Sequence, residues 1–200
     1  MSKILRDDLL LISQLIEMNE KILDVGCGDG NLLEYLSKEK NADCRGIEIK
    51  REGVNECVKK GLSVIQGDAN YDLEDYPDKS FSTVILSQTI QAMILPDEVI
   101  ENLIRIGKRA IISFPNFGFW KVRKDFLFNG GMPKNKILPY EWYETPNIHL
   151  CSKMDFIEFC KKKKILIRDF ISLNEKGAII NNSFLSNLLA YQVIFCVSKK

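Results

Sequence analysis

The sequence predicts an α/β protein with a mostly parallel sheet, and three observations support this class. Apolar segments of strand length alternate with segments whose apolar residues recur at helical spacing. The first strand-like segment runs directly into a glycine-rich loop and then into a helix, as in folds that bind nucleotides. The chain has 200 residues, of which 46% are hydrophobic, so one three-layer domain with a substantial core is expected.

The first half of the chain supplies four strands and three helices. Apolar residues at helical spacing, among them Ile12 and Ile16, predict an amphipathic helix over residues 8–17. The polar stretch 69–80, which is rich in acids and broken by Pro77, predicts a loop with at most one helical turn. The other elements expected here are strands at 22–25, 44–49, 62–66 and 81–87 and helices at 31–39 and 51–60.

The second half continues the alternation and ends with two further strands. Pro96 and the acids after it predict the start of a helix that runs to Ile106. Ser152 and Asp155 have the spacing of a capping box, which predicts the start of a helix over 153–163. Five strands that alternate with helices imply a parallel sheet with right-handed crossovers. The strands expected here are 109–114, 166–173 and 191–197, and the connection 174–189 is expected to be irregular or briefly helical.

The loop between the first strand and its helix has glycines at alternate positions, Gly26, Gly28 and Gly30. Glycine has no Cβ, so a ligand can lie on the bare backbone, and the first amides of the following helix point at that ligand. A dinucleotide fingerprint would need its third glycine at position 31, where the chain has Asn31. The spacing therefore favours a different nucleotide cofactor.

Two carboxylates follow at the ends of the next two strands. Glu48 lies 22 residues beyond Gly26, and a carboxylate at that place can accept both hydroxyls of a ribose without a 2′-phosphate. Asp68 follows the third strand. Each feature alone is common in turns, but together they lie in order where an open α/β sheet places its ligands.

Asp24, two residues before the first glycine, completes a pattern that resembles motif I of the class I S-adenosylmethionine-dependent methyltransferases. The resemblance implies a three-layer Rossmann-like fold with a mostly parallel seven-stranded sheet, in the order 3-2-1-4-5-7-6, whose last strand is antiparallel. It implies S-adenosylmethionine or S-adenosylhomocysteine as the cofactor, with Asp68 accepting the adenine amino group. The cofactor-binding candidates are Asp24, Gly26, Gly28, Asp29, Gly30, Glu48, Ile49, Asp68, Ala69 and Ser87.

Charge and cysteine content argue against several classes of function. The net charge of +1 provides no general field to attract nucleic acid or an anionic membrane. No stretch of about 18 uncharged apolar residues exists, and charges come too early after Met1 for a signal peptide, so we expect a soluble protein, which the cysteine usage places in the reducing cytoplasm. The six cysteines form no C-x-x-C pair and are expected to be reduced, and with one histidine we expect no metal site.

Residues 114–143 depart from the alternating rhythm because they hold nine aromatic residues, three prolines and the pair Gly130-Gly131. Long ordered loops often carry function, which predicts a lid or a docking surface. The alternative is a loop that its own aromatic side chains tie down.

Several segments are similar to MetW, a family of bacterial methionine-biosynthesis proteins, and the similarity runs over nearly the whole chain. They are LSQTIQA at 86–92, SFPNFG at 113–118, LPY at 138–140 and WYETPNIHLC at 142–151. The resemblance implies a single class I methyltransferase-like domain over 1–200 with an aromatic-rich insertion at about 114–150. It also implies a role with homoserine O-acyltransferase, which activates homoserine for methionine synthesis. The substrate or partner candidates are Asn116, Trp120, Tyr140, Trp142, Tyr143 and His149.

His149 is the only histidine, so histidine-dependent chemistry would rest on it. In an extended segment His149 and Cys151 share a face and could form a nucleophile pair, although no third residue that would orient them is identifiable. The favoured alternative is a histidine that bonds a backbone carbonyl where the loop returns to the sheet. Methyl transfer needs no obligatory base, so no catalytic residue is assigned.

Three functional hypotheses follow from the sequence. The first is a MetW-like cofactor-binding protein that docks on homoserine O-acyltransferase. The second is a small-molecule methyltransferase, although the Asn/Asp-Pro-Pro-aromatic motif of amino methyltransferases is absent around Pro115. The third is a noncatalytic sensor in which cofactor binding changes a partner surface.

Overall fold

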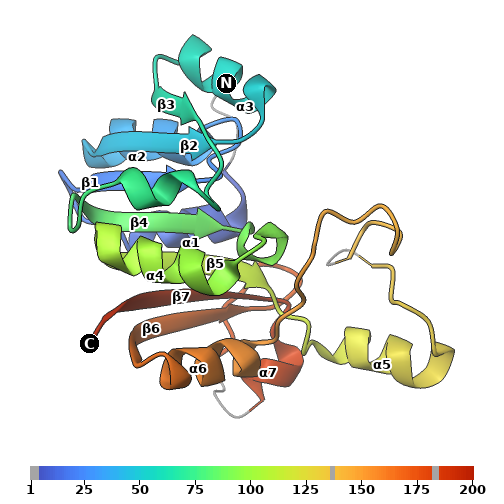
Figure 1. Ribbon diagram of the computed structural model, residues 1–200. Coiled ribbons are helices and arrows are strands. Elements are labelled where there is room, and N and C mark those ends of the chain that lie inside the picture. The colour runs from blue at the N-terminus through green and yellow to red at the C-terminus, as the bar shows by residue number, and fades with distance from the viewer. Residues whose placement is uncertain (1–4, 136–137, 182–184) are drawn as a thin grey trace.

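A computed structural model describes residues 5–135, 138–181 and 185–200, which form an open, twisted sheet with helices on both faces (Figure 1). Residues 1–4, 136–137 and 182–184 lie outside the described residues. They belong to the N-terminal segment, to the predicted aromatic segment 114–143 and to the connection 174–189. The strands are β1 (Lys21–Val25), β2 (Asp43–Glu48), β3 (Ser63–Gln66), β4 (Phe81–Ser87), β5 (Gly107–Pro115), β6 (Ile165–Leu173) and β7 (Gln192–Lys199).

Within the described residues the seven strands lie in the order β3-β2-β1-β4-β5-β7-β6. The first five strands pair in parallel, and β7 runs antiparallel to both β5 and β6. The predicted fold class is therefore confirmed, including the strand order and the antiparallel last strand.

Helix α1 precedes the first strand, and the other helices lie in connections between strands, together with two short 3₁₀ turns among the described residues. They are α1 (Asp7–Gln14), α2 (Asn31–Lys40), α3 (Arg51–Lys59), α4 (Pro96–Ile106), α5 (Trp120–Asn129), α6 (Lys153–Lys162) and α7 (Ser186–Leu189), with 3₁₀ turns η1 (Asp72–Asp75) and η2 (Ile90–Ala92). The predicted capping box is present, because Ser152 Oγ accepts from the Asp155 amide and Asp155 Oδ2 accepts from the Ser152 amide. The single predicted helical turn in 69–80 is η1.

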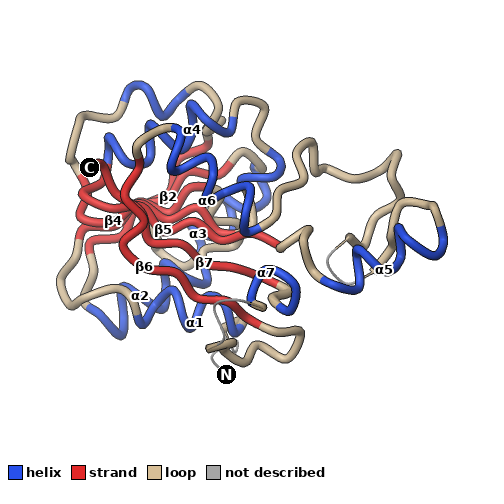
Figure 2. The backbone as a smooth tube through the Cα atoms, turned by 90° about the horizontal axis from the view of Figure 1, so that it is seen from below, coloured by secondary structure: helices blue, strands red, loops and turns tan. Residues whose placement is uncertain are grey.

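Helices cover both faces of the sheet (Figure 2), and the central strands are buried, whereas the edge strands β3 and β6 are partly exposed. Ile22 and Ile85 pack in a core cluster with residues of α1 and α2, whereas their neighbours Leu23 and Val84 pack in a second cluster with residues of α4 and α6. Because successive strand residues point to opposite faces, both must be apolar, which explains the continuous apolar strands in the sequence.

Helix α1 is shorter than predicted. The sequence pattern runs to residue 17, but the helix ends at Gln14. The next carbonyl, that of Leu15, accepts a hydrogen bond of 2.7 Å from Nη2 of Arg109 on β5. The carbonyl just beyond the helix end is therefore bonded by a side chain from a distant strand, and the local periodicity of apolar residues cannot predict such a contact.

Candidate cofactor site

The glycine loop joins the end of β1 to the start of α2 at the carboxyl edge of the parallel strands. Gly26, Gly28 and Gly30 have φ angles of +73°, +57° and +74°, a region that residues with a side chain rarely adopt. A Cβ on Gly28 would meet no atom within 4 Å, whereas a Cβ on Gly30 would lie 2.7 Å from Sγ of Cys57. The bare backbone of Gly28 thus leaves room for a ligand, while close packing requires Gly30.

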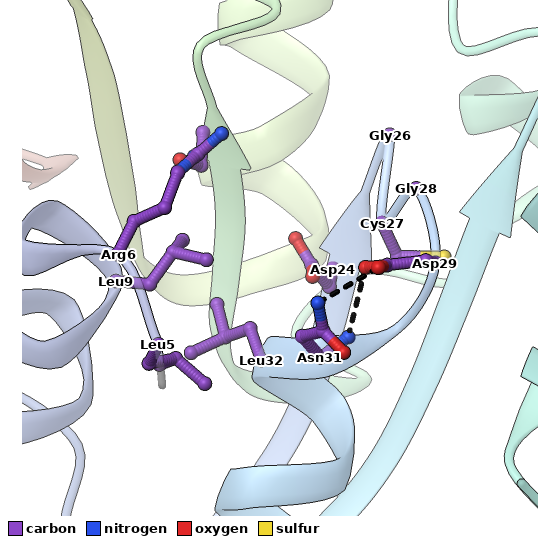
Figure 3. Close-up of a pocket in the computed structure, with 11 residues that line it drawn as sticks. Leu5, Arg6, Leu9, Asp24, Gly26, Cys27, Gly28, Asp29, Asn31 and Leu32 are labelled. Atoms are coloured by element: carbon purple, nitrogen blue, oxygen red, sulfur yellow. Dashed lines mark hydrogen bonds between the residues drawn. The ribbon is translucent and has the colours of Figure 1, made fainter. Parts of the chain in front are cut away.

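A cavity of about 380 Å³ opens beside this loop (Figure 3). The predicted residues Asp24, Gly26, Gly28, Asp29 and Ser87 line it. The segment around α1 forms the wall opposite the loop in Figure 3. The lining residues that were not predicted are Leu5, Arg6, Leu9, Cys27, Asn31 and Leu32.

Asp24 brings a buried carboxyl group to the cavity. Its exposed fraction is 3%. Burial raises the pKa of Asp24 to about 7, and the negative charge of Glu48 adds to the rise while Arg6 opposes it. Near neutral pH this carboxyl group therefore exchanges a proton readily, and a nearby positive charge would favour its ionised form.

Glu48 fixes the glycine loop from the neighbouring strand. Its Oε2 accepts a hydrogen bond of 2.8 Å from the Gly28 amide, and its Oε1 accepts one of 2.9 Å from the Lys50 amide. The Glu48 side chain is not among the described residues that line the cavity at Asp24, but it bonds Gly28, which does line that cavity. Two carboxylate oxygens offer about four acceptor positions, so Glu48 retains capacity for further donors.

Asp68 lies at the same edge of the sheet as Glu48, because Glu48 on β2 is in register with Gln66 on β3. Oδ1 of Asp68 accepts from the backbone amide and the side-chain amide of Asn70, at 2.9 and 2.8 Å. Ile49 is exposed and Ala69 is buried. None of these side chains lines the 380 Å³ cavity, so the predicted residues fall into two groups, one at the cavity and one at the strand ends that carry Glu48 and Asp68.

Arg6 is the basic residue of the cavity, and sequence reasoning missed it. Its guanidinium donates to both carboxylate oxygens of Asp8, each at 3.1 Å, and Asp8 is buried. Oδ2 of Asp8 also accepts from Nε2 of Gln192 on β7. The position of Arg6 depends on contacts across almost the whole chain, so no local pattern identifies it.

Residues 117–135 and 138–148, here called the aromatic arm, project away from the sheet (Figures 1 and 2). Phe119 and Val122 anchor its base in a small cluster with Leu138. The outer part is open, with Trp142 72% and Tyr143 66% exposed. The arm therefore has an anchored base and an exposed end. Its exposed large side chains are Trp120, Phe126, Leu127, Phe128, Met132, Tyr140, Trp142, Tyr143 and Ile148.

Asn116, a predicted substrate or partner residue, is fully buried and fully hydrogen-bonded. Nδ2 donates to the carbonyls of Asn187 and Ala190, each at 2.8 Å. Oδ1 accepts from the amides of Gly118 and Lys153, at 3.1 and 2.9 Å. Asn116 thus joins β5 to the starts of the arm and α6, and its predicted contact with a substrate or partner stays a prediction.

His149 lies in an exposed segment whose backbone is tied to η2. The amides of Ile148 and His149 both donate to the Gln91 carbonyl, at 2.8 and 2.9 Å. Nε2 of His149 lies 3.4 Å from the Ile94 carbonyl oxygen, a contact of the kind that sequence reasoning favoured. Burial raises the pKa of Cys151 to about 12, so its thiol stays protonated at neutral pH and is a poor nucleophile.

Within the described ranges, 5–135, 138–181 and 185–200, no three or more histidine, cysteine, aspartate or glutamate side chains group closely enough to hold a metal ion. No helix in these ranges has both the length and the apolar character needed to cross a membrane.

Solved structures with the same architecture include S-adenosylmethionine-dependent methyltransferases. One from Archaeoglobus fulgidus superposes with a TM-score of 0.67 at 17% identity, covering 97% of this chain and 95% of that one. A possible histamine N-methyltransferase from Thermotoga maritima superposes with a TM-score of 0.66 at 18% identity, covering 96% and 87%. These similarities establish the methyltransferase fold.

Sequence comparison identifies the family. The bifunctional methionine biosynthesis protein MetXA/MetW of Rhodopirellula baltica is 32% identical over 145 residues, which are 68% of this chain and 23% of that protein. The chain spans less than half the length of the curated relatives that it matches. The family described as methionine biosynthesis protein MetW matches residues 6–197. The chain therefore belongs to the MetW family.

Proposed function

We propose that the chain binds S-adenosylmethionine or S-adenosylhomocysteine at the glycine loop and acts with homoserine O-acyltransferase in methionine biosynthesis. The observation that carries the cofactor part is the 380 Å³ cavity against the bare backbone of Gly28. A side chain at Gly28 would meet no protein atom within 4 Å, so the space beside it is available to a ligand. The buried Asp24 carboxyl supplies a negative partner for a ligand cation.

The residues at the site suit the parts of this cofactor. Asp24 and Arg6 provide opposite charges for the amino and carboxylate groups of its methionyl part. Glu48 has acceptor capacity for the ribose hydroxyls, and Asp68 has it for the adenine amino group. When bound, S-adenosylmethionine would supply an electrophilic methyl group, and the chain would position it and exclude water.

Calorimetric titration tests the cofactor. We expect saturable binding of S-adenosylmethionine and S-adenosylhomocysteine and none of a nicotinamide dinucleotide. Binding of the dinucleotide alone would overturn the proposal.

Support for the partner comes from a relative and from the arm. In the Rhodopirellula baltica protein, MetW is joined in one chain to MetXA, and we identify MetXA with the homoserine O-acyltransferase that the family resemblance implies. Exposed aromatic side chains such as Trp142 and Tyr143 are enriched at interface hot spots. Two cations on the arm are engaged within the chain: Lys121 pairs with Glu175 at 2.6 Å and Arg123 donates to the Gly118 carbonyl.

Mixing the purified chain with homoserine O-acyltransferase from the same organism tests the partnership. We expect a complex that the double variant Trp142→Ala/Tyr143→Ala weakens by about 2 kcal/mol or more. The matched control is Val58→Ala, which removes an equally exposed apolar side chain from α3. The proposal fails if no complex forms and acyltransferase activity does not change, while labelled methyl from S-adenosylmethionine appears on a metabolite.

A further inference from the structure

A second cavity, of about 430 Å³, lies between η2, the start of α4 and the first part of α6. It has no described lining residue in common with the cofactor cavity. Its wall at η2 begins three residues beyond the end of β4, so it lies toward the carboxyl edge of the parallel strands. Ligands of open α/β sheets bind at this edge.

The walls of the second cavity are mainly apolar. Ile100 and Phe156 are buried side chains, while Ile94 and Leu95 are exposed. Such a cavity can hold a small organic molecule, which gains free energy by removing apolar surface from water. The apolar lining residues are Ile90, Ile94, Leu95, Ile100, Phe156 and Phe159.

Residues of two distinctive segments, 86–92 and 142–151, line this cavity: Ile90 and Gln91 from the first, His149 and Cys151 from the second. None of these four residues lines the cofactor cavity. The segment that contains His149 and Cys151 is held over η2 by the two hydrogen bonds to the Gln91 carbonyl. Nε2 of His149 approaches the Ile94 carbonyl oxygen at 3.4 Å. The backbone on this side of the cavity is therefore fixed before any ligand binds.

The polar groups at the cavity are mainly hydrogen-bond acceptors. Asp97 and Asp155 contribute carboxylates, and a hydrogen bond from Lys163 lowers the pKa of Asp97, so this group is ionised at neutral pH. The side-chain oxygen of Gln91 is buried without a hydrogen-bond partner among the described residues. Acceptors favour a ligand that donates, and carboxylates repel an anion.

We propose that the second cavity binds an uncharged, largely apolar small molecule with one hydrogen-bond donor, such as a medium-chain alcohol. The apolar part covers the walls, the donor bonds one of the acceptors, and a cavity whose polar groups are mainly acceptors disfavours an anion of the same shape. This site is independent of the proposed cofactor site and goes beyond the proposed function.

Fluorescence titration with N-phenyl-1-naphthylamine, an uncharged apolar probe with one N–H group, tests the site. We expect saturable binding, which 1-octanol displaces and octanoate at the same concentration does not. The substitution Ile94→Asp should weaken probe binding about tenfold or more, because it places a charge at an apolar wall.

Leu95→Asp is a second variant that should keep its fold, because Leu95 is the N-cap residue of α4 and aspartate is a preferred N-cap. The control is Leu127→Asp, which places the same charge on the arm, where the wild-type side chain is 78% exposed. The proposal is overturned if the probe does not bind, if octanoate competes as well as 1-octanol, or if only Leu127→Asp reduces binding.

Discussion

Asp24 shows how one buried carboxyl group links the site to pH. An acid normally ionises near pH 4, but burial at the end of β1 brings the pKa of Asp24 to about 7. The folded chain therefore holds this proton more tightly than the unfolded chain does. Strand β1, which positions the glycine loop, thus carries the Asp24 carboxyl group, whose ionisation destabilises the folded chain unless a cation binds beside it.

The first prediction concerns stability and pH. Because the folded-state pKa of Asp24 is raised, its contribution to the free energy of unfolding is greatest below about pH 4 and is lost as pH rises to about 7. Relative to Asp24→Asn, the wild type should lose up to about 4 kcal/mol over this range and no more above it. Urea unfolding at pH 4, 5.5, 7 and 8.5 measures this difference, and parallel curves for the two proteins would contradict it.

The second prediction concerns Glu48. Its carboxylate already bonds the Gly28 amide, and the cofactor proposal assigns it the ribose hydroxyls as well. Glu48→Ala should therefore weaken binding by about 1.5 to 3 kcal/mol, equally for S-adenosylmethionine and S-adenosylhomocysteine, because both contain the same ribose. Calorimetry provides the measurement, and Glu52→Ala on the exposed face of α3 is the control. Unchanged affinity in the Glu48 variant would remove the ribose assignment.

At the scale of elements, the sequence predicted the strands and helix starts that depend on short-range patterns of residues. The strands appear as apolar runs because Leu23 and its neighbours pack on both faces of the sheet, and the helix start at Ser152 follows from a local hydrogen-bond exchange. Helix α5 was not predicted, because its apolar residues Leu127 and Phe128 are exposed and create no buried stripe. Arg6 was missed for a related reason: its position depends on contacts between distant segments.

The third prediction tests a cluster at the amino edge of the sheet, opposite the candidate site. Arg109 on β5 donates to Oγ1 of Thr83 at 2.9 Å and to Oε1 of Glu20 at 2.7 Å, besides its bond to the Leu15 carbonyl. Arg109→Leu removes the donor to Thr83 Oγ1 and to the Leu15 carbonyl and the cation beside the Glu20 carboxylate, and should reduce the free energy of unfolding by about 2 to 3 kcal/mol. Lys108→Leu, on the exposed preceding residue, is the control. Cofactor affinity should be the same in both variants, and a loss of affinity in Arg109→Leu would show that this edge also shapes the site.

The fourth prediction concerns the aromatic arm. A small cluster around Phe119 and Val122, the Lys121–Glu175 ion pair and the bonds to the Gln91 carbonyl hold the arm, while most of its large side chains are exposed. The amides of 120–129 should therefore exchange hydrogen faster than those of β4 and β5. Addition of homoserine O-acyltransferase should slow exchange in the arm and leave the strands unchanged. Hydrogen exchange followed by mass spectrometry measures this, and equal exchange with and without the acyltransferase would leave the arm as scaffold.

At the scale of the whole molecule, one sheet carries two features with different chemistry. The cofactor cavity lies beside β1, whereas the aromatic arm leaves the sheet after β5 (Figure 1). Thr89, between β4 and η2, is close to the glycine loop, since a Cβ on Gly26 would lie 3.0 Å from its Oγ1. The η2 backbone in turn binds the segment that ends the arm, through the Gln91 carbonyl. A continuous set of contacts thus connects the loop with the return of the arm.

The fifth prediction is that these contacts couple the two binding events. If cofactor binding changes the affinity for homoserine O-acyltransferase by some factor, the acyltransferase must change the affinity for the cofactor by the same factor. We expect a factor of about 5 or more, measured by calorimetry in both directions with S-adenosylhomocysteine, which cannot donate a methyl group. Thr89→Ala should reduce this factor while each separate affinity stays near its wild-type value, and Thr145→Ala on the arm is the control. A factor of one in both directions would mean that cofactor binding and acyltransferase binding are independent. A methyltransferase that binds the acyltransferase without coupling to its own cofactor would then explain the data better.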